Sequence, residues 1–394
     1  VSTSNPVLGN FAAGYAYRSD GNKENNSSAS SYGSSYTTGD VIGIALDMDA
    51  GNLVFYKNGT SQGTAFSSLS GTFHFCGTPR ENGTYIFNFG QRAFTYQNAG
   101  TNRPAATYKA LCTTNLLTPT IADGSDYFEA KLYTGDGTSA SSTQAITGFS
   151  FSPDFLWAKS RNVTAGHAIY DTVRASTQRL SSSQTTVFNN EGYFESFDSN
   201  GFTVKGDGNN TNANNQPYVA FCWDAASSTV SNTDGTITPT GVRANQTAGF
   251  SVVTYTGTGT APSTVGHGLN AAPSLIFFKR RDTTSNWITY NSSIGATKYL
   301  VLNNTGAAVT DSGPFNNTAA TSTVFTVNTF SDINANGGTY VAYCFAPVAG
   351  FSAFGEYSGN SSSDGVFVHT GFRPAWLMVK STNATGSWSI FDNK

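Results

Sequence analysis

The sequence predicts an all-β protein made of serial antiparallel β-sandwich domains of the jelly-roll or concanavalin A-like kind. Composition is the first reason. Charged residues make up only 11% of the 394 residues, aromatic residues make up 13%, and glycine occurs 41 times. β-branched and aromatic side chains suit a pleated sheet, and Gly and Asn form the turns between short strands. The second reason is a long internal repeat, which indicates several copies of one small domain.

The repeat begins three times along the chain. Each copy opens with a proline, continues with an apolar run of strand length and reaches a lysine, over residues 153–159, 273–279 and 374–380. The first two copies also close alike, because Tyr218–Trp223 matches Tyr340–Phe345. Proline is tolerated at the start of a strand, and the spacing of the copies is that of a small domain. We therefore expect three copies of one fold, entered at equivalent strands.

The cysteines predict neither a disulfide framework nor a metal centre. Cys222 and Cys344 occupy the same place in two copies of the repeat, and Cys76 and Cys112 lie outside the copies. No two cysteines have the spacing of metal ligands. A buried free cysteine behaves as a small hydrophobic residue, so we expect Cys222 and Cys344 to be equivalent, buried and unpaired.

Residues 1–100 lack the repeat and predict strands of their own. Residues 40–46 and 53–56 are apolar runs of strand length, with a turn between them. Asn58-Gly59 is a strong hairpin signal, since both residue types tolerate positive φ. Two further strands are expected over 71–75 and 84–89.

The same residues resemble a known family. Gly39–Asp47, Val54–Gly59 and Asn88–Gln91 fall in the order and at the distances found in the later part of a SPRY domain. The resemblance covers roughly residues 14 to 96, and the earlier strands of such a domain are not evident. It implies a concanavalin A-like β-sandwich that binds protein or glycan through its loops.

These observations divide the chain into six parts. They are a SPRY-like β-sandwich over 1–100, a connector over 101–126, repeat 1 over 127–231, a linker over 232–248, repeat 2 over 249–348 and the start of repeat 3 over 349–394. The third copy stops halfway. That predicts either a fragment of a longer protein or a fold that another chain completes.

The combination of a SPRY-like unit with β-repeats resembles tail fibre or lectin-like structural proteins of bacteriophages. This resemblance implies a location on the virion surface, with an extracellular fibril as the alternative. It also implies self-association as a trimer or a filament, contacts with other virion proteins, and contact with glycans of the host surface.

Catalytic chemistry finds little support in the sequence, and we expect no catalytic residues, no metal site and no cofactor. His167 aligns with Trp287 and Trp388, so its position requires a flat ring rather than a base. Asp171 and Asp392 are the best candidates for a carboxylate pair, but Asn291 replaces them in the middle copy. The repeated lysines are expected to cover apolar surface or to pair with those aspartates.

Two classes of partner are excluded by charge and hydropathy. The net charge is −3 and no basic run occurs, so we expect no nucleic acid partner. No apolar stretch of about 18 residues occurs, so we expect no membrane insertion.

The candidate ligand-binding residues lie in two polar loops and at two tryptophans. The loop over 205–215 contributes Asp207, Asn209 and Asn212, and the loop over 331–338 contributes Asn334 and Asn336. An amide offers a donor and an acceptor together, the pairing that a sugar hydroxyl needs. Trp287 and Trp388 lie beside polar segments and are candidates for a surface role. The alternative is that the Asn and Gly residues of the loops only shape turns.

The function that the sequence predicts is therefore a non-enzymatic virion appendage protein that adheres to host-surface glycans. Three alternatives stay open: a purely architectural virion component, an extracellular fibril subunit and, least favoured, a polysaccharide depolymerase.

Overall fold

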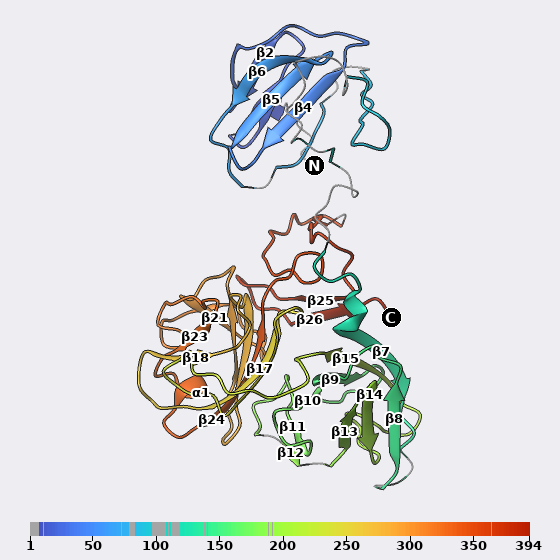
Figure 1. Ribbon diagram of the computed structural model, residues 1–394, viewed down its shortest axis with the longest axis vertical. Helices are drawn as coiled ribbons and strands as arrows, with labels where there is room; N and C mark the ends of the chain where they lie inside the picture. Colours follow the sequence, from blue (N-terminus) through green and yellow to red (C-terminus); the bar gives the residue numbers. More distant parts are fainter. Residues whose placement is uncertain are drawn as a thin grey trace. The chain divides into compact units, whose positions relative to one another are not determined.

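The computed structural model describes residues 8–10, 12–71, 73–78, 83–96, 108, 110–111, 119–137, 139, 141–187, 189–190, 192–363 and 365–394. The chain forms two compact units, residues 1–117 and residues 118–394, and each is described by itself (Figure 1). Strands dominate both units, which confirms the all-β class. Most of the expected connector, including Cys112, lies outside the described residues.

The N-terminal unit contains two three-stranded antiparallel sheets. They are formed by β1 (Tyr15–Tyr17), β2 (Asn22–Asn25) and β3 (Ser28–Ser31), and by β4 (Ile42–Asp47), β5 (Asn52–Lys57) and β6 (Thr60–Phe66). A short 3-10 helix, η1 (Leu8–Asn10), precedes them. Tyr17, Leu53, Phe55, Ala65 and Leu69 form the core of this unit.

The hairpin predicted at Asn58-Gly59 is confirmed. β5 and β6 pair across this turn, with Lys57 opposite Thr60. Asn58 has φ 49° and Gly59 has φ 82°, which is the left-handed backbone that such a turn requires. The Asn58 side chain also accepts a hydrogen bond of 2.8 Å from the backbone N–H of Val41, which ties the turn to the neighbouring strand.

Two expectations for this unit are wrong. The described residues of 71–75 and 84–89 form no strand; instead Phe75 packs edge-on against Phe87 and Phe89, with ring centroids 5.1 and 5.2 Å apart. The segment before residue 39 does contain earlier strands, β1 to β3. β1 has only three residues, and β2 and β3 are polar, so alternation of apolar residues did not reveal them.

Repeat 1 is a β-sandwich that follows the 3-10 helix η3 (Gly124–Asp126). One sheet has the order β10-β9-β15-β7 and the other the order β13-β14-β8, while β11 pairs with β12. Leu156, Tyr170, Phe202 and Cys222 lie in the core between the sheets. The strands are β7 (Phe128–Thr134), β8 (Thr143–Thr147), β9 (Phe155–Ser160), β10 (Ala168–Asp171), β11 (Gln178–Arg179), β12 (Asn189–Asn190), β13 (Phe194–Asp198), β14 (Gly201–Lys205) and β15 (Pro217–Trp223).

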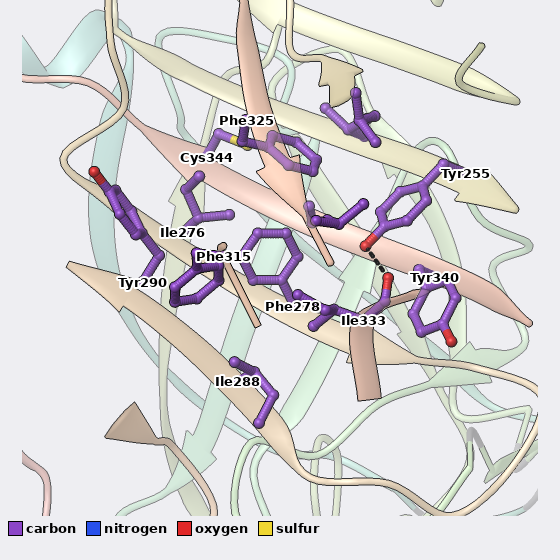
Figure 2. Packing of buried hydrophobic residues seen from close by; sticks show 14 of the residues in the cluster. Tyr255, Ile276, Phe278, Ile288, Tyr290, Phe315, Phe325, Ile333, Tyr340 and Cys344 are labelled. Carbon is purple, nitrogen blue, oxygen red and sulfur yellow. Dashed lines mark hydrogen bonds between the residues drawn. The ribbon is translucent and has the colours of Figure 1, made fainter. Parts of the chain in front are cut away.

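Repeat 2 has the same plan with a larger sheet, in the order β16-β17-β24-β19-β20-β21-β22, and a small sheet of β18 and β23. Figure 2 shows its core, in which the Tyr255 hydroxyl donates to the carbonyl of Ile333 at 2.8 Å. Its elements are β16 (Gly241–Asn245), β17 (Phe250–Thr256), β18 (Ser263–Gly266), β19 (Leu275–Arg280), β20 (Trp287–Asn291), β21 (Lys298–Val301), β22 (Val309–Thr310), β23 (Val324–Val327), the helix α1 (Ser331–Asn334) and β24 (Thr339–Phe345).

The register confirms that repeats 1 and 2 are copies of one fold. Lys159 of β9 lies opposite Val219 of β15, and Lys279 of β19 lies opposite Val341 of β24. Cys222 and Cys344 occupy the equivalent positions predicted for them, and both are fully buried free thiols. Repeat 3 contributes a two-stranded sheet of β25 (Trp376–Val379) and β26 (Ser389–Asp392), which correspond to β19 and β20.

The repeats are joined by a shared hydrophobic cluster. The main sheet of each complete repeat buries one face in its own sandwich and the other face in this cluster. Trp157, Phe277 and Met378, which occupy the same position in the three repeats, all belong to or pack against it. Equivalent residues of the three repeats thus meet in one cluster, and residues 118–394 form one compact unit (Figure 1).

Candidate functional site

The first predicted ligand loop is braced from within by Asn212. This residue is fully buried, and its amide Nδ2 donates to the Gly206 carbonyl at 2.8 Å and to the Asp136 carboxylate at 3.3 Å. Its Oδ1 accepts from the backbone N–H of Asp136 at 3.2 Å. The side chain thus ties the loop to the end of β7, and its donors and acceptor face the protein.

Asn334 braces the equivalent loop in repeat 2. It is also fully buried; its Oδ1 accepts from the N–H of Thr258 at 2.9 Å, and its Nδ2 donates to the Thr260 carbonyl at 2.9 Å. The expectation that Asn212 and Asn334 present free amides to a ligand is therefore wrong. Both are structural braces between a loop and the strand that begins the repeat.

Three predicted loop residues, Asp207, Asn209 and Asn336, are exposed. A tyrosine hydroxyl holds each loop: Tyr218 donates to the Asn209 carbonyl at 3.0 Å, and Tyr340 donates to the Ser331 carbonyl at 2.8 Å. The exposed side chains therefore project from a fixed backbone, and they are the predicted loop residues that a ligand can reach.

Trp287 is not at the surface, so its predicted surface role is wrong. The side chain is fully buried, and its Nε1 donates to the Ser181 carbonyl of repeat 1 at 2.9 Å. Trp388 is half-buried and makes the equivalent bond, to the Val301 carbonyl of repeat 2, at 3.1 Å. Each tryptophan thus holds its own repeat against the preceding one.

The repeated lysines reinforce these two junctions. Lys279 Nζ donates to the Thr185 carbonyl of repeat 1 at 3.0 Å, and Lys380 Nζ donates to the Thr305 carbonyl of repeat 2 at 3.4 Å. Thr185 and Thr305 occupy the same place in their repeats. We call Lys279 with Trp287 the first latch, and Lys380 with Trp388 the second latch. Burial lowers the pKa of Lys279 to about 8.

Of the two roles predicted for the repeated lysines, pairing with Asp171 is wrong. Asp171 is buried and pairs with Arg174, whose Nε lies 2.6 Å from its Oδ2. The hydroxyl of Tyr343, in repeat 2, donates to the same oxygen at 2.7 Å. A buried carboxylate is stable only with such partners, and this group therefore anchors repeat 2 on repeat 1.

His167 occupies the position in repeat 1 that Trp287 and Trp388 occupy in repeats 2 and 3. Its ring is partly buried there, as expected for a position that requires a flat ring rather than a base. The Trp157 Nε1 donates to its Nδ1 at 2.7 Å. Burial, with a smaller contribution from Lys159, lowers the pKa of His167 to about 4. The imidazole is therefore neutral at neutral pH. Among the residues that the structure describes, no group of three or more His, Cys, Asp or Glu side chains is placed to hold a metal ion.

A cleft of about 450 Å³ lies between repeats 2 and 3. It is lined mainly by polar side chains, which include Ser293, Lys298, Thr310, Glu356, Thr382 and Asn383. Such a lining offers hydroxyl, amide and one charge of each sign to a ligand. Sequence reasoning missed these residues because they come from segments far apart in the chain, with no spacing to connect them.

The fold is that of an all-β protein with a SPRY domain ahead of a repeat unit. A family model for the SPRY domain matches residues 3–92, which confirms the concanavalin A-like expectation. A second family model, "Domain of unknown function (DUF7483)", matches residues 123–394. Because that match spans well over half of the chain, the chain belongs to the DUF7483 family.

Two curated proteins are similar over a shorter stretch. The "ATP-dependent RNA helicase Ddx1" of Drosophila melanogaster is 32% identical over 96 residues, 24% of this chain. The "ATP-dependent RNA helicase DDX1" of Xenopus laevis is 33% identical over 92 residues, 23% of this chain. The aligned stretches span only 13% and 12% of those helicases. No solved structure matches the chain, and no helix in its described part is long and apolar enough to cross a membrane.

Proposed function

We propose that this protein is a non-enzymatic appendage protein of a virion that adheres to glycans on the host surface. The observation that carries the proposal is the polar cleft between repeats 2 and 3, lined by Lys298, Glu356 and Asn383 together with three hydroxyl side chains. Neutral sugars present many hydroxyls, and amide and hydroxyl groups can serve each of them as donor and acceptor. The SPRY domain supports a binding role, since domains of that family bind through their loops.

The shared core of the repeats supports the structural part of the proposal. An appendage must keep its binding surfaces fixed, and the two latches and the hydrogen bond from Tyr343 to Asp171 hold the repeats in one body. In the proposal the chain self-associates, as a trimer or a filament, and contacts other virion proteins. Sedimentation of the purified chain and labelling of whole particles test these two statements.

The experiment on the glycan is a binding assay on host cells and on a glycan array. The cleft variant is Lys298→Ala with Asn383→Ala, and the loop variant is Asp207→Ala with Asn209→Ala and Asn336→Ala. We expect the cleft variant to lose affinity by about tenfold or more with unchanged thermal unfolding, while the loop variant binds normally.

Three other outcomes redirect the proposal. Loss of binding in the loop variant alone would move the glycan to the exposed loops. Normal binding by both variants would contradict both sites. Release of reducing ends from a bound polysaccharide would make the protein a depolymerase instead.

A further inference from the structure

The main sheets of repeats 1 and 2 differ at one edge. In repeat 2, β17 is covered on both sides, because it pairs with β24 and with β16. In repeat 1 the equivalent strand is β7, which pairs with β15 and, among the residues that the structure describes, with no strand on its other side (Figure 1). β7 has seven residues, and an unpaired strand edge is a ready template for another strand.

The backbone of β7 presents hydrogen-bonding groups to this open edge at alternate residues. Just before the strand, the carbonyl of Tyr127 accepts from the N–H of Asp224, which follows β15, at 3.0 Å. Odd-numbered residues therefore bond toward β15, because the bonding direction alternates along an antiparallel strand. The N–H and C=O groups that point away from β15 are those of the even-numbered residues Phe128, Ala130 and Leu132.

The side chains of β7 carry opposite charges on one face and apolar groups on the other. Glu129 and Lys131 lie on the first face and form an ion pair of 3.5 Å, with both side chains partly exposed. Leu132 lies on the second face and is 40% exposed, and Phe128 lies half-buried on the same face. Read in the reverse direction, this order of side chains is complementary to itself.

We propose that β7 pairs antiparallel with β7 of a second copy of this chain, across a two-fold axis at Ala130. The outward N–H and C=O groups of Ala130 then bond to those of Ala130 in the second copy. In this register Glu129 lies opposite Lys131 of the second copy, and Phe128 lies opposite its Leu132. The main sheets of the two copies join into one continuous sheet.

Charge selects this register over its neighbours. Because the outward backbone groups must meet, even-numbered residues lie opposite even-numbered residues. An axis moved by one residue, to Glu129 or to Lys131, sets two carboxylates or two ammonium groups directly opposite each other, which is destabilising. With the axis at Ala130, opposite charges meet at pairs that share no hydrogen bonds, where facing side chains come closest.

The occupant is a second copy because the strand is its own complement. A two-fold contact uses the same surface on both partners and closes as a dimer. The proposal thus goes beyond the trimer or filament of the proposed function. It does not depend on glycan binding, because β7 belongs to repeat 1 and the polar cleft is lined by residues of repeats 2 and 3.

Sedimentation equilibrium of the full chain measures the association, and we expect a reversible dimer. Glu129→Lys and Lys131→Glu each place like charges opposite each other, so each variant alone should dimerise about tenfold more weakly or worse. An equimolar mixture of the two variants restores opposite charges across the contact and should dimerise as the unmodified protein does, although neither chain regains its own ion pair. Lys205→Glu, which breaks an exposed ion pair elsewhere in repeat 1, is the control and should leave the association unchanged.

Hydrogen exchange locates the contact. On dimerisation the amides of Phe128, Ala130 and Leu132 should become protected, whereas those of Glu129 and Lys131, which already bond to β15, should not change. A monomer at the highest soluble concentration would overturn the proposal, as would a mixture of the two variants that associates no better than either alone. An oligomer that neither variant weakens would overturn the β7 contact and leave the self-association of the proposed function standing on another surface.

Discussion

The two latches make the same hydrogen bonds in different surroundings. In the first latch, Lys279 and Trp287 are fully buried between repeats 1 and 2. In the second latch, Lys380 and Trp388 are half-buried. The two latches therefore have the same hydrogen-bond partners but differ in how deeply their side chains are buried. Burial adds apolar transfer energy to the tryptophan and a desolvation cost to the lysine, so the two latches should differ in stability although their bonds match.

The largest difference is expected on removing the two tryptophans. Trp287→Ala empties a fully packed site and should lower the free energy of unfolding by about 3–5 kcal/mol. Trp388→Ala, at a half-buried site, should cost clearly less. Chemical denaturation followed by circular dichroism measures both variants. Equal losses would mean that the hydrogen bond, and not burial, sets the strength of a latch.

A similar contrast should hold for the two equivalent aspartates. Arg174→Met leaves Asp171 as a buried carboxylate without its cation, which should cost about 3–5 kcal/mol. Asp171→Asn in the same variant removes that charge and should restore much of the loss. Asp392→Asn, at an exposed position, should change stability by only about 0.5 kcal/mol or less. Denaturant midpoints of the four proteins test this, and no recovery in the double variant would contradict it.

The lysines should differ in their pH dependence. The pKa of Lys279 falls from 10.5 to about 8 because the side chain is buried. Between these values the unfolded chain binds a proton that the folded chain does not, so the free energy of unfolding rises as the pH rises. Below about pH 8 both states are protonated and this contribution is constant.

Lys279→Met should remove the increase in the free energy of unfolding between about pH 8 and 10. Lys380→Met should leave most of this increase. Urea denaturation at pH 7.5 and at higher pH compares the variants. A slope unchanged by Lys279→Met would show that another group titrates in this window.

The smallest expected effect isolates the indole hydrogen bond. Trp287→Phe keeps an aromatic ring but leaves the Ser181 carbonyl without its donor, which should cost about 1–3 kcal/mol in a buried site. Trp388→Phe should cost less, since water can replace the donor at a half-buried site. Thermal unfolding of the pair checks the order, and the reverse order would contradict the burial argument.

Much of this fold follows from sequence alone. The repeat predicted equivalent strands and the equivalent burial of Cys222 and Cys344, because copies of one sequence place equal residues in equal surroundings. Asn58-Gly59 predicted a turn, because local backbone preference decides a hairpin of two residues.

The shared cluster and the latches could not be predicted in the same way. A strand buried on both faces reads as a continuous apolar run, whatever covers its second face. Trp287 lies beside polar residues in sequence, but its partner is more than one hundred residues earlier. Asn212 and Asn334 likewise match the pattern of a sugar site, and only the tertiary structure turns their amides inward.

The cluster that joins the repeats also constrains how the three copies can diverge. Trp157 and Phe277 lie in this cluster with ring centroids 6.2 Å apart, and Met378, at the equivalent position of repeat 3, packs against the same cluster. Interiors are close-packed, so a larger residue at one of these positions has to be accommodated by the rest of the cluster, which other repeats supply. The effect of a substitution in one repeat therefore depends on residues of a different repeat.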